Sequence, residues 1–321
     1  MQQQNLEINT KKINVFLANP RGFCAGVERA ISIVEMALKK YGSPIYIKHE
    51  IVHNKYVVDS LKKKGAIFVD SIDDVPLGSY VIYSAHGVSR KVEDSSRARD
   101  LKVFDATCPL VKKIHNQIVK LNQEQKQIIL IGHSGHPEVE GTSGRIDAEV
   151  LLVENKEDAL NLQVKDPDNL SYTTQTTLSV DDTKEIVDIL KSRFPNIIEP
   201  KSDNICYATQ NRQDSVKKLV KKIDLLLVIG SINSSNSNRL KDIGVNNNIE
   251  SYLISTKDDI RASWLKSKKN IAITAGASAP EILVREVIAF LETNYNIQIH
   301  NESGVTENIM FNLPKELRDE N

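Results

Sequence analysis

The chain has 321 residues and carries 42 Lys and Arg against 42 Asp and Glu, so its formal net charge is zero and its pI is near 7.1. This balance argues against a broad surface for nucleic acid or for an acidic membrane. The length predicts two or three domains, and no apolar run of the sequence approaches the roughly 20 residues that span a bilayer.

Short apolar runs alternate along the chain with amphipathic stretches, the pattern typical of an α/β protein with parallel sheets. Residues 1–12 are polar and lack the apolar stretch of a signal peptide, so we expect a flexible N-terminal extension of a cytoplasmic protein. Strands are predicted at residues 14–18, 45–48, 66–69, 80–84, 103–105, 127–131, 150–153, 171–174, 225–229, 251–254 and 270–274. Helices are predicted between most of them, among them 27–38, 110–121, 216–223 and 282–291.

Three cysteines recur at intervals of about one domain. Cys24, Cys108 and Cys206 are 84 and 98 residues apart, and each precedes a helical pattern. Two polar residues follow each cysteine near strand ends: His53 and His86, His136 and Thr176, and Ser234 and Ser278. This register predicts three pseudo-equivalent α/β units with mainly parallel sheets around a central cavity, at 13–106, 107–203 and 204–297. Residues 298–321 are predicted to form a tail that packs across the units.

The number and spacing of the cysteines narrow their chemistry. An odd number cannot close pairwise into disulfides, which fits a reducing compartment. No C-x₂₋₄-C pair typical of a structural zinc site is present. Three cysteines on a cubane iron–sulfur cluster would leave one iron with an open position for substrate. A catalytic zinc ion bound by three thiolates, and three ordinary buried cysteines, remain alternatives.

The densest set of titratable side chains follows the predicted strand 127–131, in residues 132–141. Its glycines permit tight turns, which we expect to place His136 and Glu138 at the sheet edge rather than inside a helix. His136 could bind an anion there. A carboxyl near low-dielectric walls can retain a proton near neutral pH, so Glu138 could transfer one. The alternative is a solvated polar loop.

Other polar segments also follow strands. His53 and His86 repeat with the cysteine register, and we interpret them with His136 as a diphosphate clamp strengthened by partial protonation. Residues 231–238, 274–281 and 174–179 resemble anion cradles at helix N-termini, with capping boxes predicted at 278–281 and 179–182. Plain helix capping is the alternative for each, and the role of His133 stays open. The sequence contains no Walker A or G-x-G-x-x-G motif, so no nucleotide site is predicted.

Seven segments, in order, resemble the signature motifs of the 4-hydroxy-3-methylbut-2-enyl diphosphate reductase family. They are NPRGFCAGV (19–27), DATCP (105–109), GHPEVEG (135–141), TQTT (174–177), ICYAT (205–209), SSNSNR (234–239) and AGASAP (275–280). The resemblance extends from about Asn14 to Arg318. Seven separate motifs in order are far more specific than any one of them.

The resemblance implies the last step of the non-mevalonate isoprenoid pathway. The 4-hydroxyl of (E)-4-hydroxy-3-methylbut-2-enyl diphosphate is removed reductively, with two electrons and two protons, to give isopentenyl and dimethylallyl diphosphates. It also implies one [4Fe-4S] cluster per chain, bound by Cys24, Cys108 and Cys206, whose fourth iron takes the substrate hydroxyl. By the same resemblance Glu138 delivers protons and Thr176 orders the hydroxyl. The residues implied to hold the diphosphate are His53, His86, His136, Ser234, Ser235, Asn236 and Ser278.

The resemblance further implies ferredoxin or flavodoxin as the electron donor, with neither nucleic acid nor membrane as a partner. An alternative of another class is a non-catalytic iron–sulfur redox sensor that binds the diphosphate. Glu138 beside the pocket argues against that alternative, because a sensor needs no proton donor.

Overall fold

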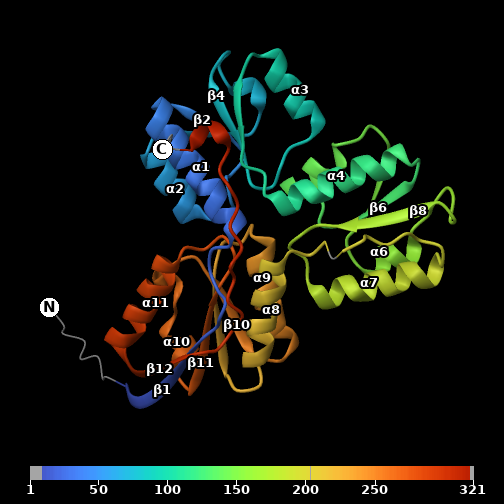
Figure 1. Ribbon diagram of the computed structural model, residues 1–321. Coiled ribbons are helices and arrows are strands. Elements are labelled where there is room, and N and C mark those ends of the chain that lie inside the picture. Colours follow the sequence, from blue (N-terminus) through green and yellow to red (C-terminus); the bar gives the residue numbers. More distant parts are fainter. Residues whose placement is uncertain (1–8, 203, 319–321) are drawn as a thin grey trace. The chain divides into compact units, whose positions relative to one another are not determined.

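The structure is a computed structural model that describes residues 9–202 and 204–318. Strands and helices alternate through this part of the chain (Figure 1). Residues 1–8 of the predicted flexible extension lie outside the described residues. Residues 9–12 belong to the first strand, so the prediction that they form part of a flexible extension was wrong.

The bounds of the elements largely follow the predicted ranges. The strands are β1 (Asn9–Leu17), β2 (Ile45–Lys48), β3 (Ala66–Val69), β4 (Tyr80–Tyr83), β5 (Lys102–Asp105), β6 (Gln127–Ile131), β7 (Val150–Val153), β8 (Leu170–Thr174), β9 (Leu225–Ile229), β10 (Glu250–Ile254), β11 (Asn270–Ala275) and β12 (Tyr295–Asn301). The α-helices are α1 (Ala25–Tyr41), α2 (Lys55–Lys63), α3 (Arg90–Ala98), α4 (Pro109–Gln123), α5 (Pro137–Ser143), α6 (Lys156–Asn161), α7 (Val180–Arg193), α8 (Tyr207–Leu219), α9 (Ser235–Asn246), α10 (Ala262–Leu265) and α11 (Glu281–Asn294). Three short 3-10 helices are η1 (Ile72–Asp74), η2 (Lys257–Asp259) and η3 (Lys315–Leu317).

The described strands form three sheets, ordered β10-β9-β11-β1-β12, β3-β2-β4-β5 and β7-β6-β8. All pairings between these strands are parallel, which confirms the predicted α/β class. β1 departs from its predicted place: it was assigned to the unit 13–106 but pairs with β11 and β12. β12 was not predicted, although YNIQIHN alternates apolar and polar residues, a pattern typical of a half-buried strand.

The contacts between residues divide the chain into two compact units. The first combines the residues up to Phe23 with Gln210–Asn308. The second combines Cys24–Thr209 with the residues from Ile309 onward. These bounds differ from the predicted ranges: 13–106 and 107–203 fall mostly in one compact unit, whereas residues 9–23 join most of the range 204–297. The predicted tail 298–321 is shared between the units.

The first unit has a sheet covered on both faces (Figure 1). Alternate residues of β9 define these faces, because successive side chains of a strand point in opposite directions. Leu225 and Leu227 belong to the core that includes Val284 of α11. Leu226 and Val228 belong to the core with residues of α8 and α9. The polar loops after β9 and β11 therefore lie together at the carboxyl edge of a sheet buried on both sides.

The second unit contains the other two sheets. In the three-stranded sheet, Ile129 of β6 packs in one core with Ile186 of α7, and Ile128 packs in another with Ile118 of α4. In the four-stranded sheet, Val81 and Tyr83 of β4 share a core with residues of η1 and the loop that follows it. No helix in residues 9–202 and 204–318 is long and apolar enough to cross a membrane.

Two helix starts differ from prediction, and one agrees. Ser179 caps α7 by accepting a hydrogen bond from the backbone N–H of Asp182 at 3.2 Å, which is one half of the capping box predicted there. The capping box predicted at 278–281 was wrong, because the cap residue of α11 is Pro280, with no side-chain cap. The helix predicted at 216–223 begins much earlier, at Tyr207. Its first turns bury polar residues such as Thr209 and Gln213, so hydrophobic periodicity could not reveal them.

Candidate functional site

Each cysteine lies at the start of a helix. Cys24 is the cap residue of α1 and Cys108 that of α4, while Cys206 directly precedes α8. All three belong to the second unit, all are partly buried, and these three described residues form no disulfide. A helix N-terminus presents unpaired N–H groups and the positive end of the helix dipole. These starts can therefore stabilise thiolates.

The side chains of the three cysteines converge. A Cβ atom placed on Gly26 would lie 2.7 Å from Sγ of Cys108 and 3.9 Å from Sγ of Cys24, so both sulfurs face the space above this glycine. The thiolates of Cys24 and Cys206 both act on the pKa of Cys108. The backbone N–H of Ala25, beside Cys24, donates to the hydroxyl of Tyr207, beside Cys206, at 3.4 Å. The structure thus brings together three thiols that are far apart in sequence.

The thiols are poor acids in this site. Burial, and then the nearby Cys24, raise the pKa of Cys108 to about 12. The same two causes raise the pKa of Cys206 to about 11, although Thr209 donates its backbone N–H to Sγ at 3.4 Å. Three thiolates this close repel one another, and a cationic metal group would remove the repulsion while displacing the protons.

The cysteines fit a cluster. In the described part of the chain, no group of three or more His, Cys, Asp or Glu side chains is arranged to ligate a single metal ion. An iron–sulfur cluster binds each cysteine through a different iron atom, so its thiols need not meet at one point. Gly26 leaves open the space that a larger residue would fill beside two of the sulfurs. The three cysteines and this glycine therefore suit the predicted cofactor.

The three predicted clamp histidines of the second unit lie together. The ring of His53 stacks on that of His86 with centroids 4.1 Å apart. The ring of His136 stands edge-on to both, at 5.3 Å from His53 and 5.7 Å from His86. Each residue is partly exposed. Nδ1 of His53 lies 3.0 Å from a carboxylate oxygen of Glu50, which orients the ring.

Burial and neighbouring rings lower the pKa values of His86 and His136. Burial, and then His53 and His133, lower the pKa of His136 to about 3. Burial, and then His53 and His136, hold the pKa of His86 well below its usual value. The interpretation that partial protonation strengthens the clamp therefore does not hold for these two rings without a bound anion. At neutral pH they act as neutral hydrogen-bond donors, and a bound diphosphate would raise their pKa values.

Glu138 is buried and bonded to the other predicted catalytic residue. The backbone N–H of Thr176 donates to Oε1 of Glu138 at 2.6 Å, and its hydroxyl donates to Oε2 at 2.9 Å. Burial raises the pKa of Glu138 to about 7 despite these two hydrogen bonds, so the carboxyl is close to half protonated at neutral pH. The carbonyl of Thr176 accepts from the backbone N–H of Cys206 at 3.0 Å. Thr176 therefore links Glu138 to the loop that carries Cys206.

One prediction about the segment that holds His136 and Glu138 was wrong. Glu138 does not lie at a bare sheet edge but in the first turn of α5, whose cap residue is His136. Nδ1 of His136 accepts from the backbone N–H of Glu138 at 3.1 Å, so Nε2 is the ring atom left to face a ligand. Pro137 at the first helical position favours this start.

Backbone hydrogen bonds connect the histidine loops to a second cysteine. The N–H of Cys108 donates to the carbonyl of Ala85, beside His86, at 3.0 Å. The N–H of Ala85 donates in turn to the carbonyl of Ile51, two residues before His53, at 3.0 Å. These backbone hydrogen bonds hold the segments that carry His53, His86 and Cys108 next to one another.

The four predicted diphosphate ligands of the first unit lie at the ends of adjacent strands. Ser234 caps α9, and Ser235 and Asn236 lie in its first turn, after β9. Ser278 lies in the loop after β11. Oδ1 of Asn236 accepts from the backbone N–H of Ala277 at 2.8 Å and so draws the two loops together. Ser234, Asn236 and Ser278 are buried.

Some contributors were not singled out from the sequence. Gly26 was quoted only within a motif, and its signal is a glycine two residues after a cysteine at a helix start. Tyr207 and Glu50 also adjoin predicted site residues but carry no separate sequence signal. The role of His133 was left open by the sequence. Its Nδ1 lies 3.9 Å from a carboxylate oxygen of Glu154, and its backbone N–H donates to the side-chain oxygen of Gln175.

Comparisons with known proteins show the family of this chain. A family model described as LytB protein matches residues 15–292. The 4-hydroxy-3-methylbut-2-enyl diphosphate reductase of Nitrosomonas europaea is 56% identical over 312 residues, covering 94% of this chain and 97% of that protein. The protein of the same name from Ruthia magnifica subsp. Calyptogena magnifica is 57% identical over 306 residues, covering 95% and 100%.

Two solved structures are also similar. One is the E-1-hydroxy-2-methyl-but-2-enyl-4-diphosphate reductase of Plasmodium falciparum, with a TM-score of 0.90 and 41% identity, covering 96% of this chain and 97% of that one. The other is an (E)-4-hydroxy-3-methyl-but-2-enyl diphosphate reductase, described as the terminal enzyme of the non-mevalonate pathway. It has a TM-score of 0.62 and 32% identity, covering 88% of this chain and 99% of that one.

Proposed function

The chain belongs to the LytB family, and we propose that it is a 4-hydroxy-3-methylbut-2-enyl diphosphate reductase. It converts the substrate to isopentenyl and dimethylallyl diphosphates by removing the 4-hydroxyl group with two electrons and two protons. The observation that carries the proposal is the convergence of three cysteine thiols beside Glu138, whose pKa is raised to about 7. A reductase needs both an electron path and a proton donor, and these residues suit those two tasks.

The cofactor that we propose is one [4Fe-4S] cluster per chain, held by Cys24, Cys108 and Cys206. When bound, it supplies an open iron position that polarises the hydroxyl group and a path for electrons. Gly26 keeps the space beside two of the sulfurs open. The backbone bonds from Cys108 to Ala85 and from Cys206 to Thr176 fix the loops that present the thiols.

Glu138 and Thr176 are proposed to handle the proton. A hydroxide ion is a poor leaving group, and protonation turns it into water. A carboxyl with a pKa near 7 is protonated in a large fraction of molecules at neutral pH and is still acidic enough to give the proton away. Thr176 holds both oxygens of this carboxyl, so it fixes the direction in which the proton leaves. Its hydroxyl can also order the hydroxyl group of the substrate.

The diphosphate is proposed to be bound by histidine, serine and asparagine side chains. In the second unit these are His53, His86 and His136, whose imidazoles donate hydrogen bonds. In the first unit they are the hydroxyl and amide groups of Ser234, Ser235, Asn236 and Ser278, together with the N-terminus of α9. Helix N-termini favour anions because of their unpaired N–H groups and their dipole.

The electrons are proposed to come from a ferredoxin or a flavodoxin. A small protein that delivers one electron at a time suits a cofactor that accepts one electron at a time.

An anaerobic assay tests the proposed function. The reconstituted protein is mixed with dithionite and the hydroxylated diphosphate, and the products are separated by chromatography. We expect isopentenyl and dimethylallyl diphosphates from the wild-type chain and almost none from Glu138→Gln with the same iron content. Binding without product from the wild-type chain would instead support the redox sensor. A colourless protein that contains zinc would support the zinc alternative.

A further inference from the structure

We propose that a cavity at the edge strand β5 is the docking surface for an acidic electron-transfer protein. This proposal rests on the proposed function, because only a reductase needs such a partner. The cavity has a volume of about 450 Å³ and lies wholly within the second unit. This β5 cavity is lined by residues that include Arg29, Lys102, Val103, Asp105, Lys112 and Glu316.

The β5 cavity adjoins the loop that carries Cys108. NH1 of Arg29 donates to the carbonyl of Thr107 at 3.2 Å, and NH2 donates to that of Asp105 at 3.3 Å. Thr107 directly precedes Cys108. Burial lowers the pKa of Arg29, while the charges of Asp105 and then Cys108 raise it, so the guanidinium lies within electrostatic range of the thiolate. A donor seated here would contact Arg29, which is bonded to the residue that precedes a cysteine ligand.

The surface of the cavity is cationic. Arg29 donates three hydrogen bonds, and all three go to backbone carbonyl oxygens; besides the two already described, one goes to the carbonyl of Asn312 at 2.9 Å. None of these three bonds is to a carboxylate, so they do not neutralise the positive charge of Arg29. Lys102 is exposed on the edge strand. Lys112 pairs with Asp105 at 2.6 Å, which leaves Glu316 as the other acid of the lining. Nζ of Lys40, at the rim, donates to the carbonyl of Glu316 at 2.8 Å.

Apolar groups accompany these charges. Val103 is 36% exposed, and Phe104 and Pro314 also line the cavity. A small apolar centre with a charged rim suits the weak, brief encounters of electron-transfer proteins, which bury little area and depend on charge for their rate. The charges that remain unpaired are mainly positive, so the complementary partner has an acidic face.

The electron balance is simple. Each encounter oxidises the donor by one electron and reduces the group bound by the cysteines by one electron. Two encounters supply the two electrons that the removal of one hydroxyl group consumes.

Lys102→Glu tests the proposal without touching the residues that hold the Cys108 loop. The probe is a purified acidic flavodoxin, reduced photochemically and mixed anaerobically with the cluster-loaded enzyme in a stopped-flow instrument, without substrate. We expect the second-order rate constant for cluster reduction at low salt to fall about five- to tenfold, and the difference to shrink at high salt. Calorimetry should show weaker flavodoxin binding. Reduction by dithionite should be unchanged.

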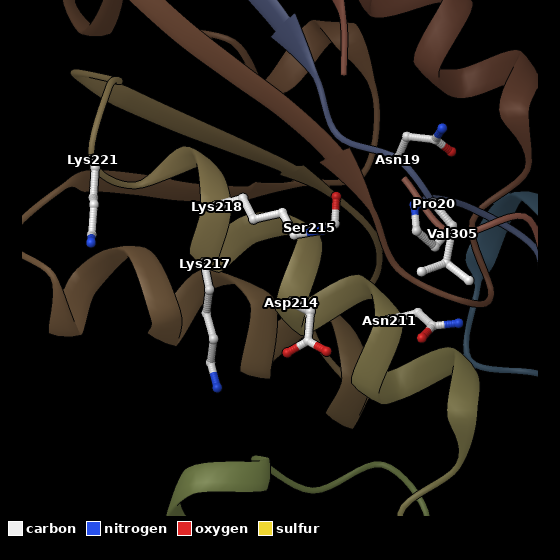
Figure 2. Close-up of a pocket in the computed structure, with 9 residues that line it drawn as sticks. All are labelled: Asn19, Pro20, Asn211, Asp214, Ser215, Lys217, Lys218, Lys221 and Val305. Atoms are coloured by element: carbon white, nitrogen blue, oxygen red, sulfur yellow. The ribbon is translucent and has the colours of Figure 1, made fainter. Parts of the chain in front are cut away.

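A second lysine-rich cavity supplies the matched control. Figure 2 shows Lys217, Lys218 and Lys221 around a cavity in the first unit, on α8 and the turn after it. Lys221→Glu makes the same change in charge at an exposed site, so it should leave the flavodoxin rate constant at the wild-type value. If Lys102→Glu loses iron, Lys102→Gln, which removes the charge without reversing it, should give a smaller decrease in the same direction.

Two results would overturn the proposal. One is a Lys102→Glu enzyme that flavodoxin reduces as fast as the wild type at low salt. The other is an equal or larger defect in Lys221→Glu, which would place the donor at the cavity of Figure 2. If no reductant gives product from the diphosphate, the proposed function fails. The reduction experiment still decides the docking site, because it uses no substrate.

Discussion

Replacing Gly26 with alanine should separate cofactor binding from folding. Gly26 is the second residue of α1 and has no left-handed φ, so alanine is compatible with its backbone. In a helix alanine is favoured over glycine by up to about 1 kcal/mol. The new Cβ, however, would lie 2.7 Å from Sγ of Cys108. Since ordinary contacts are about 3.5–4.0 Å, the sulfur must retreat by about 1 Å.

The effect of Gly26→Ala depends on whether Sγ of Cys108 is free to move. Without a cofactor, rotation about the Cα–Cβ bond of Cys108 can move Sγ away, so the metal-free chain should be as stable as the wild type or slightly more stable. With a cofactor the sulfur is fixed by its bond to iron, and the same displacement weakens ligation. Changes next to metal ligands commonly cost about 10- to 100-fold in metal affinity. The two effects therefore have opposite signs.

The assay compares Gly26→Ala with the wild type in two states. Urea denaturation gives the free energy of unfolding of the metal-free chain, and iron and sulfide after anaerobic reconstitution give the occupancy. Ala25→Gly is the matched control, because it lowers helix propensity at the neighbouring position without filling the space. Wild-type occupancy in Gly26→Ala would refute the placement of the cofactor beside this glycine. A metal-free chain that no longer folds would show that Gly26 serves the fold itself.

Three further predictions concern buried charges. Turnover should decrease as the pH rises above about 7, since Glu138 must be protonated to act, and the residual turnover of Glu138→Gln should lack this dependence in a pH–rate profile. The raised pKa also means that the folded chain binds the proton more tightly than the unfolded chain, so the contribution of Glu138 to stability is lost as the pH rises from 4.5 to about 7. Metal-free Glu138→Gln should therefore exceed the wild type by about 3 kcal/mol at pH 8 but not at pH 4 in urea denaturation. Arg212 is 0% exposed and pairs with Glu307 at 3.0 Å; Arg212→Met should lower the free energy of unfolding by about 3–5 kcal/mol, and Glu307→Gln added to it should restore part of the loss.

The parts of the fold that sequence could predict are those where apolar patterning is strong. The runs at 127–131 and 225–229 match β6 and β9 residue for residue, because both strands are buried and apolar throughout most of their length. The start of α8 escaped prediction because polar residues such as Thr209 and Arg212 are buried there, so the segment shows no apolar periodicity. β1 was placed in the wrong sheet because the sequence does not show which strands pair when their partners are more than 250 residues away.

The sequence predicted which cysteines lie together but not the electrostatics around them. The cysteine register and the motifs pointed to Cys24, Cys108 and Cys206, and the structure brings these side chains together. The protonation of the histidines could not be read from residue types, since the pKa of His136 depends on burial and on the neighbouring rings of His53 and His133. The role of Gly26 could not be predicted either, because it depends on the space that the missing side chain leaves beside two sulfur atoms.

The central claim is that three thiols of one chain hold a single iron–sulfur cluster. The most direct measurement is iron and acid-labile sulfide per chain after anaerobic reconstitution, recorded with the visible absorption spectrum. The account predicts about four of each for the wild-type chain, and loss of the visible absorption when Cys108 is replaced by alanine. A colourless wild-type protein without sulfide, or full iron content in Cys108→Ala, would contradict it.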